Sequence, residues 1–165
     1  MREYNVSATG VTVASSAPMS LVMIMPTSTQ TIEILRMWIS QNANATSNQQ
    51  GVRWGLKASV FQSTMTSTSP VALKSSDPAS KISGAATVAA GVSATGISTG
   101  TEGAGAFTVI GSDNFNVLNG WLWVPTPRET IMVNPATAYC FTLQFSAVPT
   151  TTTNWTFGVT FAELG

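Results

Sequence analysis

The chain has 165 residues, of which 44% are apolar and only 8% are charged, and its seven basic residues balance seven acidic ones. That balance provides no basic surface to neutralise phosphates, which argues against nucleic acid or an anionic membrane as a partner. The chain has no histidine and a single cysteine, Cys140. This excludes Ser-His-Asp and Cys-His catalysis, most zinc sites and an internal disulfide, so we expect a non-enzymatic protein without a metal or cofactor. Its length predicts one domain over residues 1–165.

The first predicted strands lie in the N-terminal third of the chain. The opening, MREYNVSATG, alternates through Tyr4, Val6 and Ala8, and no apolar segment of a signal peptide follows its charges. Residues 19–25, MSLVMIM, form a continuous apolar run between prolines, which predicts a buried strand. Residues 31–40, TIEILRMWIS, are largely apolar on both faces, which predicts a central strand.

Strict alternation places side chains on the faces of the next strands. In residues 31–40 it puts Trp38 on one face with Ile32, Ile34 and Arg36, opposite Glu33, Leu35, Met37 and Ile39. In residues 52–60, VRWGLKASV, it puts Val52, Trp54, Leu56, Ala58 and Val60 on a buried face and Arg53, Lys57 and Ser59 on a wet one. We expect Trp38, Trp54 and Trp155 to lie in the core, although exposed tryptophans would instead suit a carbohydrate-binding platform.

Residues 64–106 lose this pattern. They are rich in Ser, Thr, Ala and Gly and contain few large apolar side chains. A long unpatterned segment of this kind is typically a functional loop or an arm. We therefore expect a long excursion from the sandwich that drapes on a neighbouring subunit, with a short strand within AATVAAGVS, residues 85–93.

The stretch GWLWVPTPRE, residues 120–129, predicts an edge or a corner of a sheet. Trp121 and Trp123 share one face of a short strand, with Leu122 and Val124 opposite. Two prolines follow, and their missing N–H donors exclude the middle of a sheet. One interpretation is a tryptophan-lined corner between strands, and the other is a contact surface at a subunit interface.

The C-terminal part carries the strongest alternation. Residues 138–145 and 155–164 each present aromatic and aliphatic side chains on one face, and the polar VPTTTTN lies between them. We expect an antiparallel hairpin whose strands share one core, with Cys140 as a small buried side chain. With about eight strands and no helix, the chain is predicted to be an antiparallel β-sandwich, with a jelly roll favoured.

Patterns associated with enzymes lack their required context. Residues 96–100 match the G-x-S-x-G nucleophile elbow, but no helix follows them and the chain has no histidine. The seven carboxylates are scattered along the sequence, so a glycosidase pair would have to assemble in space. An enzyme is therefore the least favoured interpretation.

Two motifs carry a resemblance to a known family. MREYNVS at the start and FNVLNGWLWVPTP at residues 115–127, with a final strand ending in FAEL, resemble small β-rich structural proteins of tailed bacteriophages, described as head decoration, cement or minor capsid proteins. The resemblance covers roughly residues 1–40 and 114–165. It implies a virion protein with a jelly-roll fold that binds the capsid shell as an oligomer.

The hypothesis of a capsid-associated protein names partners and contact residues. The expected partners are the major capsid protein and copies of the chain itself, with a trimer favoured by fold analogy, on the capsid surface of a virion. The expected interface residues are Trp121, Trp123, Pro125, Pro127 and Arg128, together with Arg2 and Tyr4 of the N-terminal strand. The alternative is a carbohydrate-binding or receptor-binding module on the virion.

Overall fold

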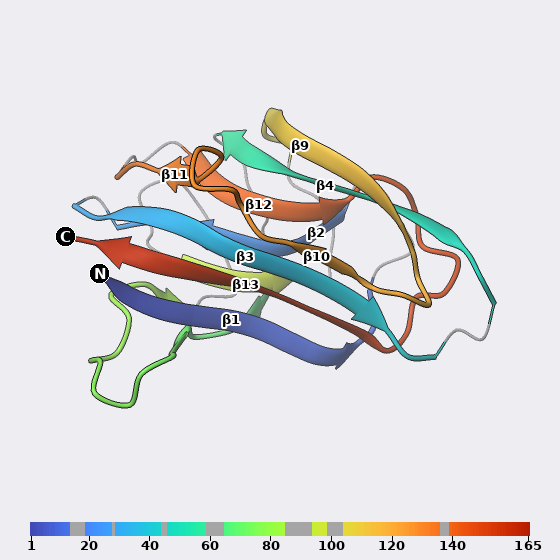
Figure 1. Cartoon of the computed structure of the whole chain (residues 1–165), viewed down its shortest axis with the longest axis horizontal. Coiled ribbons are helices and arrows are strands. Elements are labelled where there is room, and N and C mark those ends of the chain that lie inside the picture. Colours follow the sequence, from blue (N-terminus) through green and yellow to red (C-terminus); the bar gives the residue numbers. More distant parts are fainter. Residues whose placement is uncertain are drawn as a thin grey trace.

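The computed structural model describes residues 1–13, 19–27, 29–43, 46–58, 65–84, 94–98, 104–135 and 139–165. These residues form thirteen strands and no helix, arranged as two sheets that pack face to face (Figure 1). Every strand pair is antiparallel except β7 with β8. The predicted all-β sandwich is therefore confirmed.

The two sheets are ordered as follows. The first sheet runs β10 (Trp121–Trp123), β3 (Thr31–Gln41), β13 (Trp155–Leu164), β1 (Arg2–Val11), β6 (Val71–Ala72), and β11 (Ile131–Val133) also pairs with β3. The second sheet runs β5 (Met65–Ser67), β8 (Ala94–Ser98), β2 (Met19–Met25), β12 (Tyr139–Phe145), β4 (Gln49–Ala58), β9 (Phe107–Asn116), and β7 (Ser83–Gly84) pairs with β8.

The two C-terminal strands do not form the predicted hairpin. Strand β12 pairs with β2 and β4 in the second sheet, whereas β13 pairs with β1 and β3 in the first. A hairpin would place both apolar faces on the same side of one sheet. Crossing between sheets lets the two faces cover each other, and the Phe145 and Trp155 rings meet with centroids 4.7 Å apart. The shared core was predicted correctly, and the pairing was wrong.

A β-bulge in β3 reverses its faces halfway along the strand. The register with β13 shifts between Ile34 and Arg36, so Ile34 points into the core before the shift and Met37 after it. Trp38 consequently lies half-buried on the outer face, with the Arg36 guanidinium 5.0 Å from its ring centroid. Its predicted place in the core was wrong, because strict alternation cannot foresee a bulge. The central position of the strand is confirmed.

The second sheet is buried on both faces in its middle strands. Every residue of β2 is buried, as predicted. In β4, Val52 and Trp54 point into the core as expected, but Lys57 on the opposite face is only 1% exposed, so the predicted wet face is wrong at that position. Cys140 is buried, as expected, with its sulfur 3.5 Å from the Thr142 hydroxyl.

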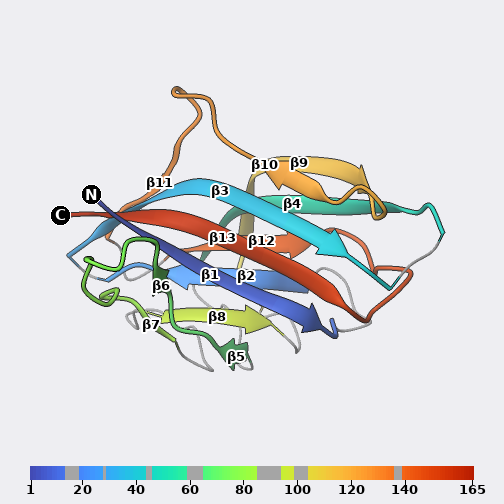
Figure 2. The same cartoon turned by 60° about the horizontal axis from the view of Figure 1, so that its bottom comes forward.

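The described part of residues 64–106 belongs to the sandwich. Strand β6 extends the first sheet beside β1, while β5 and β7 flank β8, which itself pairs with β2 (Figure 2). The predicted short strand in residues 85–93 lies outside the described residues. The described residues of this segment therefore pair with both sheets of the sandwich, and contact of the segment with a neighbouring subunit stays a prediction.

A buried carboxylate on β13 binds residues 80 and 81 to the first sheet through hydrogen bonds. Glu163 on β13 is 2% exposed and accepts hydrogen bonds from the Gln30 amide at 3.2 Å, from the Ser80 hydroxyl and from the Lys81 backbone N–H at 3.1 Å. Next to Ser80 and Lys81, Ile82 is 1% exposed in the core. We call this group the Glu163 clasp. It supplies a buried charge with the donors that it needs.

Candidate interaction site

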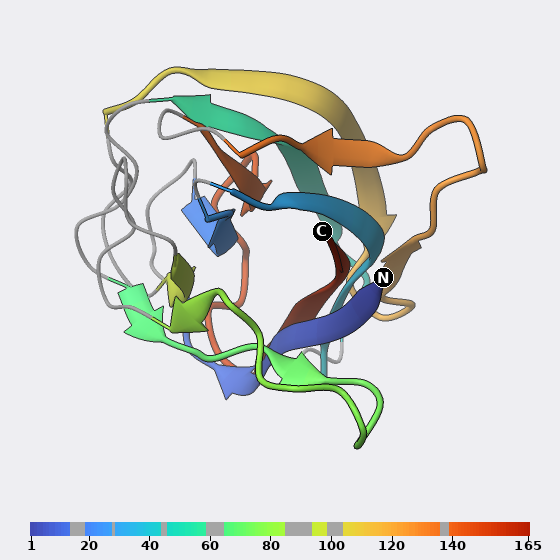
Figure 3. The same cartoon turned by 90° about the vertical axis from the view of Figure 1, so that its left-hand side faces the viewer.

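The proline-rich stretch interrupts one edge of the first sheet. Strand β10 pairs with residues 37–39 of β3, and β11 pairs with residues 32–34 of the same strand. The intervening residues 124–130 leave the edge as a loop that protrudes from the sandwich (Figures 2 and 3). Proline at positions 125 and 127 supplies no N–H for continued pairing, so the predicted edge position is confirmed.

Three tryptophans close the sandwich beside this loop. Trp121 is 8% exposed and Trp123 is half-buried, both on the inner face of β10, while Leu122 and Val124 are exposed, as the alternation predicted. The ring of Trp54, from β4 in the other sheet, lies 5.3 Å from that of Trp121 and 5.8 Å from that of Trp123. We call the side of the molecule where β9 faces β10 and β11 the open side.

The position of Trp54 depends on a glycine in the neighbouring strand. A Cβ added to Gly111 on β9 would lie 2.4 Å from Cζ2 of Trp54, so no larger residue fits without displacing the ring. Next to it, the Asp113 carboxylate accepts a hydrogen bond of 3.1 Å from Nε1 of Trp121. The two sheet edges are thus joined by aromatic packing and by one hydrogen bond.

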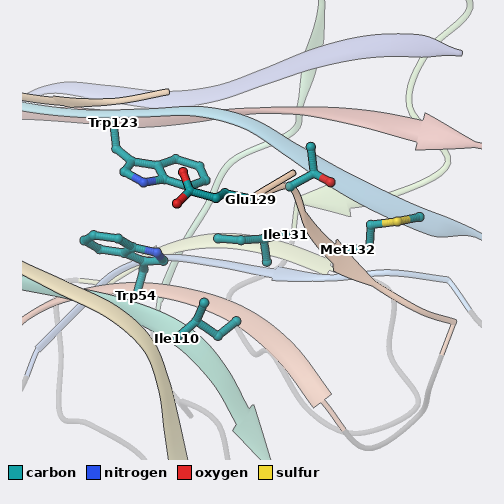
Figure 4. Close-up of a pocket in the computed structure, with 7 residues that line it drawn as sticks. Trp54, Ile110, Trp123, Glu129, Ile131 and Met132 are labelled. Atoms are coloured by element: carbon teal, nitrogen blue, oxygen red, sulfur yellow. The ribbon is translucent and has the colours of Figure 1, made fainter. Parts of the chain in front are cut away.

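A cavity of about 530 Å³ opens between the two edges (Figure 4). Two tryptophans, three aliphatic side chains, one carboxylate and one threonine line it, namely Trp54, Trp123, Ile110, Ile131, Met132, Glu129 and Thr130. Its volume lies within the range of about 300–1,000 Å³ that is typical of ligand pockets. We call this cavity the tryptophan pocket.

The carboxylate of the pocket is held in place by its own loop. The Thr126 hydroxyl donates a hydrogen bond of 3.0 Å to Oε2 of Glu129, and the Glu129 backbone N–H donates one of 2.9 Å to the Thr126 carbonyl oxygen. These two bonds close a turn that contains Pro127 and Arg128, both exposed. The turn fixes where Glu129 enters the pocket.

A smaller cavity of about 250 Å³ lies next to the tryptophan pocket. Leu56, Met132 and Tyr139 line it, with Val133 and Asn134. Met132 lines both cavities, so the two adjoin. Large hydrophobic side chains that are at least 45% exposed lie on the strands and loops of the open side, namely Val109, Ile110, Leu118, Leu122, Val124, Met132 and Tyr139. We call them the open-side patch. Among them, Leu122 lies on the outer face of the first sheet, beside Trp38.

The structure divides the predicted contact residues into two groups. Trp121, Trp123, Pro125, Pro127 and Arg128 lie together on the open side. The other two, Arg2 and Tyr4, lie on β1, which β13 and β3 separate from β10.

Of the two residues on β1, only Arg2 is exposed. Tyr4 is fully buried, and its hydroxyl donates a hydrogen bond of 3.1 Å to the Pro78 carbonyl oxygen. Its ring therefore serves the core, whereas the use of the other residues as an interface stays a prediction.

Sequence reasoning identified one of the seven residues of the tryptophan pocket, Trp123, as a contact residue and missed the other six. It placed Trp54 in the core alone and gave no function to Ile110, Glu129, Thr130, Ile131 and Met132. Because these residues come from β4, β9 and the β10–β11 region, only the pairing of distant strands brings them together. The one local signal was the pair of prolines, which implied that the chain must leave the sheet after β10.

Two kinds of site are absent from the described residues. They contain no group of three or more Cys, Asp or Glu side chains that could hold a metal ion. They also contain no helix with the length and hydropathy needed to cross a membrane.

Comparisons of the chain with protein-family models, with curated proteins and with solved structures found no match.

Proposed function

We propose that this chain is a non-enzymatic structural protein of a bacteriophage virion, which binds the capsid shell as a decoration or cement protein. The observation that carries the proposal is the open-side patch, which lies beside the loop where the sequence predicted a contact surface. Exposed apolar side chains that gather on one side of a molecule are typical of protein–protein interfaces. The resemblance of the two ends of the chain to phage head proteins supplies the identity of the partner.

The order of eight of the strands supports a jelly roll as the finer description of the fold. Eight strands form the two facing sets β1-β13-β3-β10 and β2-β12-β4-β9. Successive members alternate between the sheets except at β4 and β9, which pair with each other. A jelly roll has eight strands in two sheets joined as two Greek keys. Many viral capsid domains share this architecture, which is an argument by analogy.

The mechanism proposed is stabilisation by burial. Copies of the protein bridge neighbouring shell subunits, so that moving the subunits apart exposes apolar surface again. A stable contact of this kind buries about 800 Å² on each partner. The charge-poor surface of the chain limits repulsion between copies on the shell. The alternative, a carbohydrate platform built on Trp121, is weakened because that ring is only 8% exposed.

The test is co-sedimentation of the purified protein with empty capsid shells of the phage that encodes it, after light scattering has measured the mass of the protein alone. We expect an oligomer that binds shells in a fixed ratio. Leu122→Asp should abolish shell binding, because Leu122 is 64% exposed within the patch. Val71→Asp is the matched control, since Val71 is 66% exposed on β6, outside the patch.

Two results would overturn the proposal. One is a monomer that does not bind shells at any ratio. The other is wild-type shell binding by Leu122→Asp, which would remove the open side from the contact.

A further inference from the structure

We propose that the tryptophan pocket binds the side chain of an arginine that a partner polypeptide presents, with Trp54 and Trp123 contacting the guanidinium and Glu129 pairing with its charge. The inference takes the polypeptide nature of the partner from the proposed function. It adds the chemistry by which that partner is recognised. It assigns a binding role to residues on four strands, β4, β9, β10 and β11, and on one loop.

The first argument is the aromatic walls. The rings of Trp54 and Trp123 are tilted by 48° with centroids 5.8 Å apart, and both line the same cavity (Figure 4). The face of an indole ring attracts cations, and arginine is the side chain most often found there. This chain itself shows the preference, because Arg36 lies 5.0 Å from the Trp38 ring centroid and Arg53 lies 5.0 Å from that of Phe107.

The second argument is charge complementarity. Glu129 is the one carboxylate among the described lining residues, and those residues include no lysine or arginine. The hydrogen bond that the structure gives its carboxylate comes from the Thr126 hydroxyl and involves Oε2. A guanidinium presents planar N–H donors that match a carboxylate, and such charge-assisted bonds are about twice as strong as neutral ones.

The third argument is the apolar remainder of the pocket. Ile110, Ile131 and Met132 suit the three methylene groups of an arginine stem, which packs on apolar surface while its head reaches polar groups. A sugar ring is a poorer occupant, because each buried hydroxyl needs a hydrogen-bond partner. Besides the indole N–H groups of the two tryptophans, the described lining offers only Glu129 and Thr130 as polar side chains. Arginine is therefore favoured over a glycan.

The experiment titrates the full chain with N-acetylarginine amide and follows the indole N–H signals by NMR. N-acetylcitrulline amide is the matched probe, since it has nearly the same shape without the charge. The signal of Trp155 serves as the internal reference, because its ring is 1% exposed, packs on Phe145 and donates from Nε1 to the Thr151 carbonyl oxygen. A Trp123→Phe variant assigns the Trp123 signal.

We expect saturable shifts of the Trp54 and Trp123 signals with arginine, and binding of citrulline that is weaker by roughly tenfold. Glu129→Gln should reduce arginine binding by a similar factor while leaving the fold intact, because Glu129 lies on an exposed loop. Arg128→Gln is the control on the same loop and should bind arginine at least as well as the wild type. Added salt should weaken the interaction.

Equal binding of arginine and citrulline, or unchanged binding by Glu129→Gln, would overturn the inference. If methyl pyranosides shift the Trp54 and Trp123 signals and the arginine probe does not, the ligand of the pocket is a sugar and the inference is wrong. The outcomes are separable from those of the proposed function. Shell binding without arginine binding would refute the pocket assignment alone, and arginine binding without shell binding would refute the capsid partner.

Discussion

Replacing Glu163 with alanine should destabilise the protein and release the segment around Ser80. The Glu163 clasp holds this segment through a carboxylate that is 2% exposed. Alanine would leave the Gln30 amide and the Lys81 N–H without their acceptor. A buried donor without a partner costs about 1–3 kcal/mol. The Ser80 hydroxyl also loses its acceptor, but Ser80 is half-exposed and its O–H can donate to water instead, so we do not count it.

These two donors give an expected loss of about 2–6 kcal/mol in the free energy of unfolding. For a chain of this size, 1 kcal/mol lowers Tm by about 2–4 °C, so the melting temperature should fall by roughly 4–24 °C. Glu163→Gln keeps the shape and one carbonyl acceptor, and it should cost about 1–2 kcal/mol. Glu33→Ala is the control, since Glu33 pairs with Ala162 on β13 but is half-exposed.

Two assays report on this prediction. Urea unfolding measures the change in stability, and limited trypsin digestion measures opening of the segment, because Lys81 lies within it. Cleavage after Lys81 should be faster in Glu163→Ala than in the wild type and unchanged in Glu33→Ala. A loss of stability below about 0.5 kcal/mol, which is within the usual effect of a surface substitution, would refute the reasoning about stranded donors.

Three further predictions concern the aromatic residues. Gly111→Ala should lower the free energy of unfolding by about 1–3 kcal/mol, because its Cβ would lie 2.4 Å from the Trp54 ring. A midpoint of urea unfolding equal to that of the wild type would contradict the packing described. Trp155→Ala should lower the free energy of unfolding by about 3–5 kcal/mol, because Trp155 is 1% exposed. Trp38→Ala should lower it by about half as much or less, because Trp38 lies half-buried on the outer face. Equal losses in the two variants would place Trp38 in the core. Burial, with a smaller contribution from the Glu163 charge, raises the pKa of Tyr4 above its usual 10.0, so the stability that this residue contributes should be complete below about pH 10 and fall as pH rises further. Tyr4→Phe should remove that part of the pH dependence, and an unchanged slope between pH 8 and 11 would show that Tyr4 does not cause it.

Much of the local structure could be predicted from the sequence because strand formation follows from local patterns. A side-chain period of two marks a strand and its faces, which holds for Phe157, Val159 and Phe161 of β13. A continuous apolar run marked β2 as buried on both faces. The two prolines after Trp123 ended β10 at the sheet edge, because a missing N–H is a local property. The same local reasoning failed at Trp38, where a bulge shifted the register by one residue.

Strand partners and the pocket were decided by the tertiary structure alone. The sequence by itself determined that the chain would be all-β and charge-poor, with aromatic residues inside. Whether β12 and β13 would pair or face each other depends on how the whole chain buries its apolar faces, and no window of residues contains that information. The tryptophan pocket is of the same kind, since Trp54 and Glu129 meet only after β4 and the β10–β11 loop reach the same side of the sandwich. Local sterics set the strands, and long-range burial selected their neighbours.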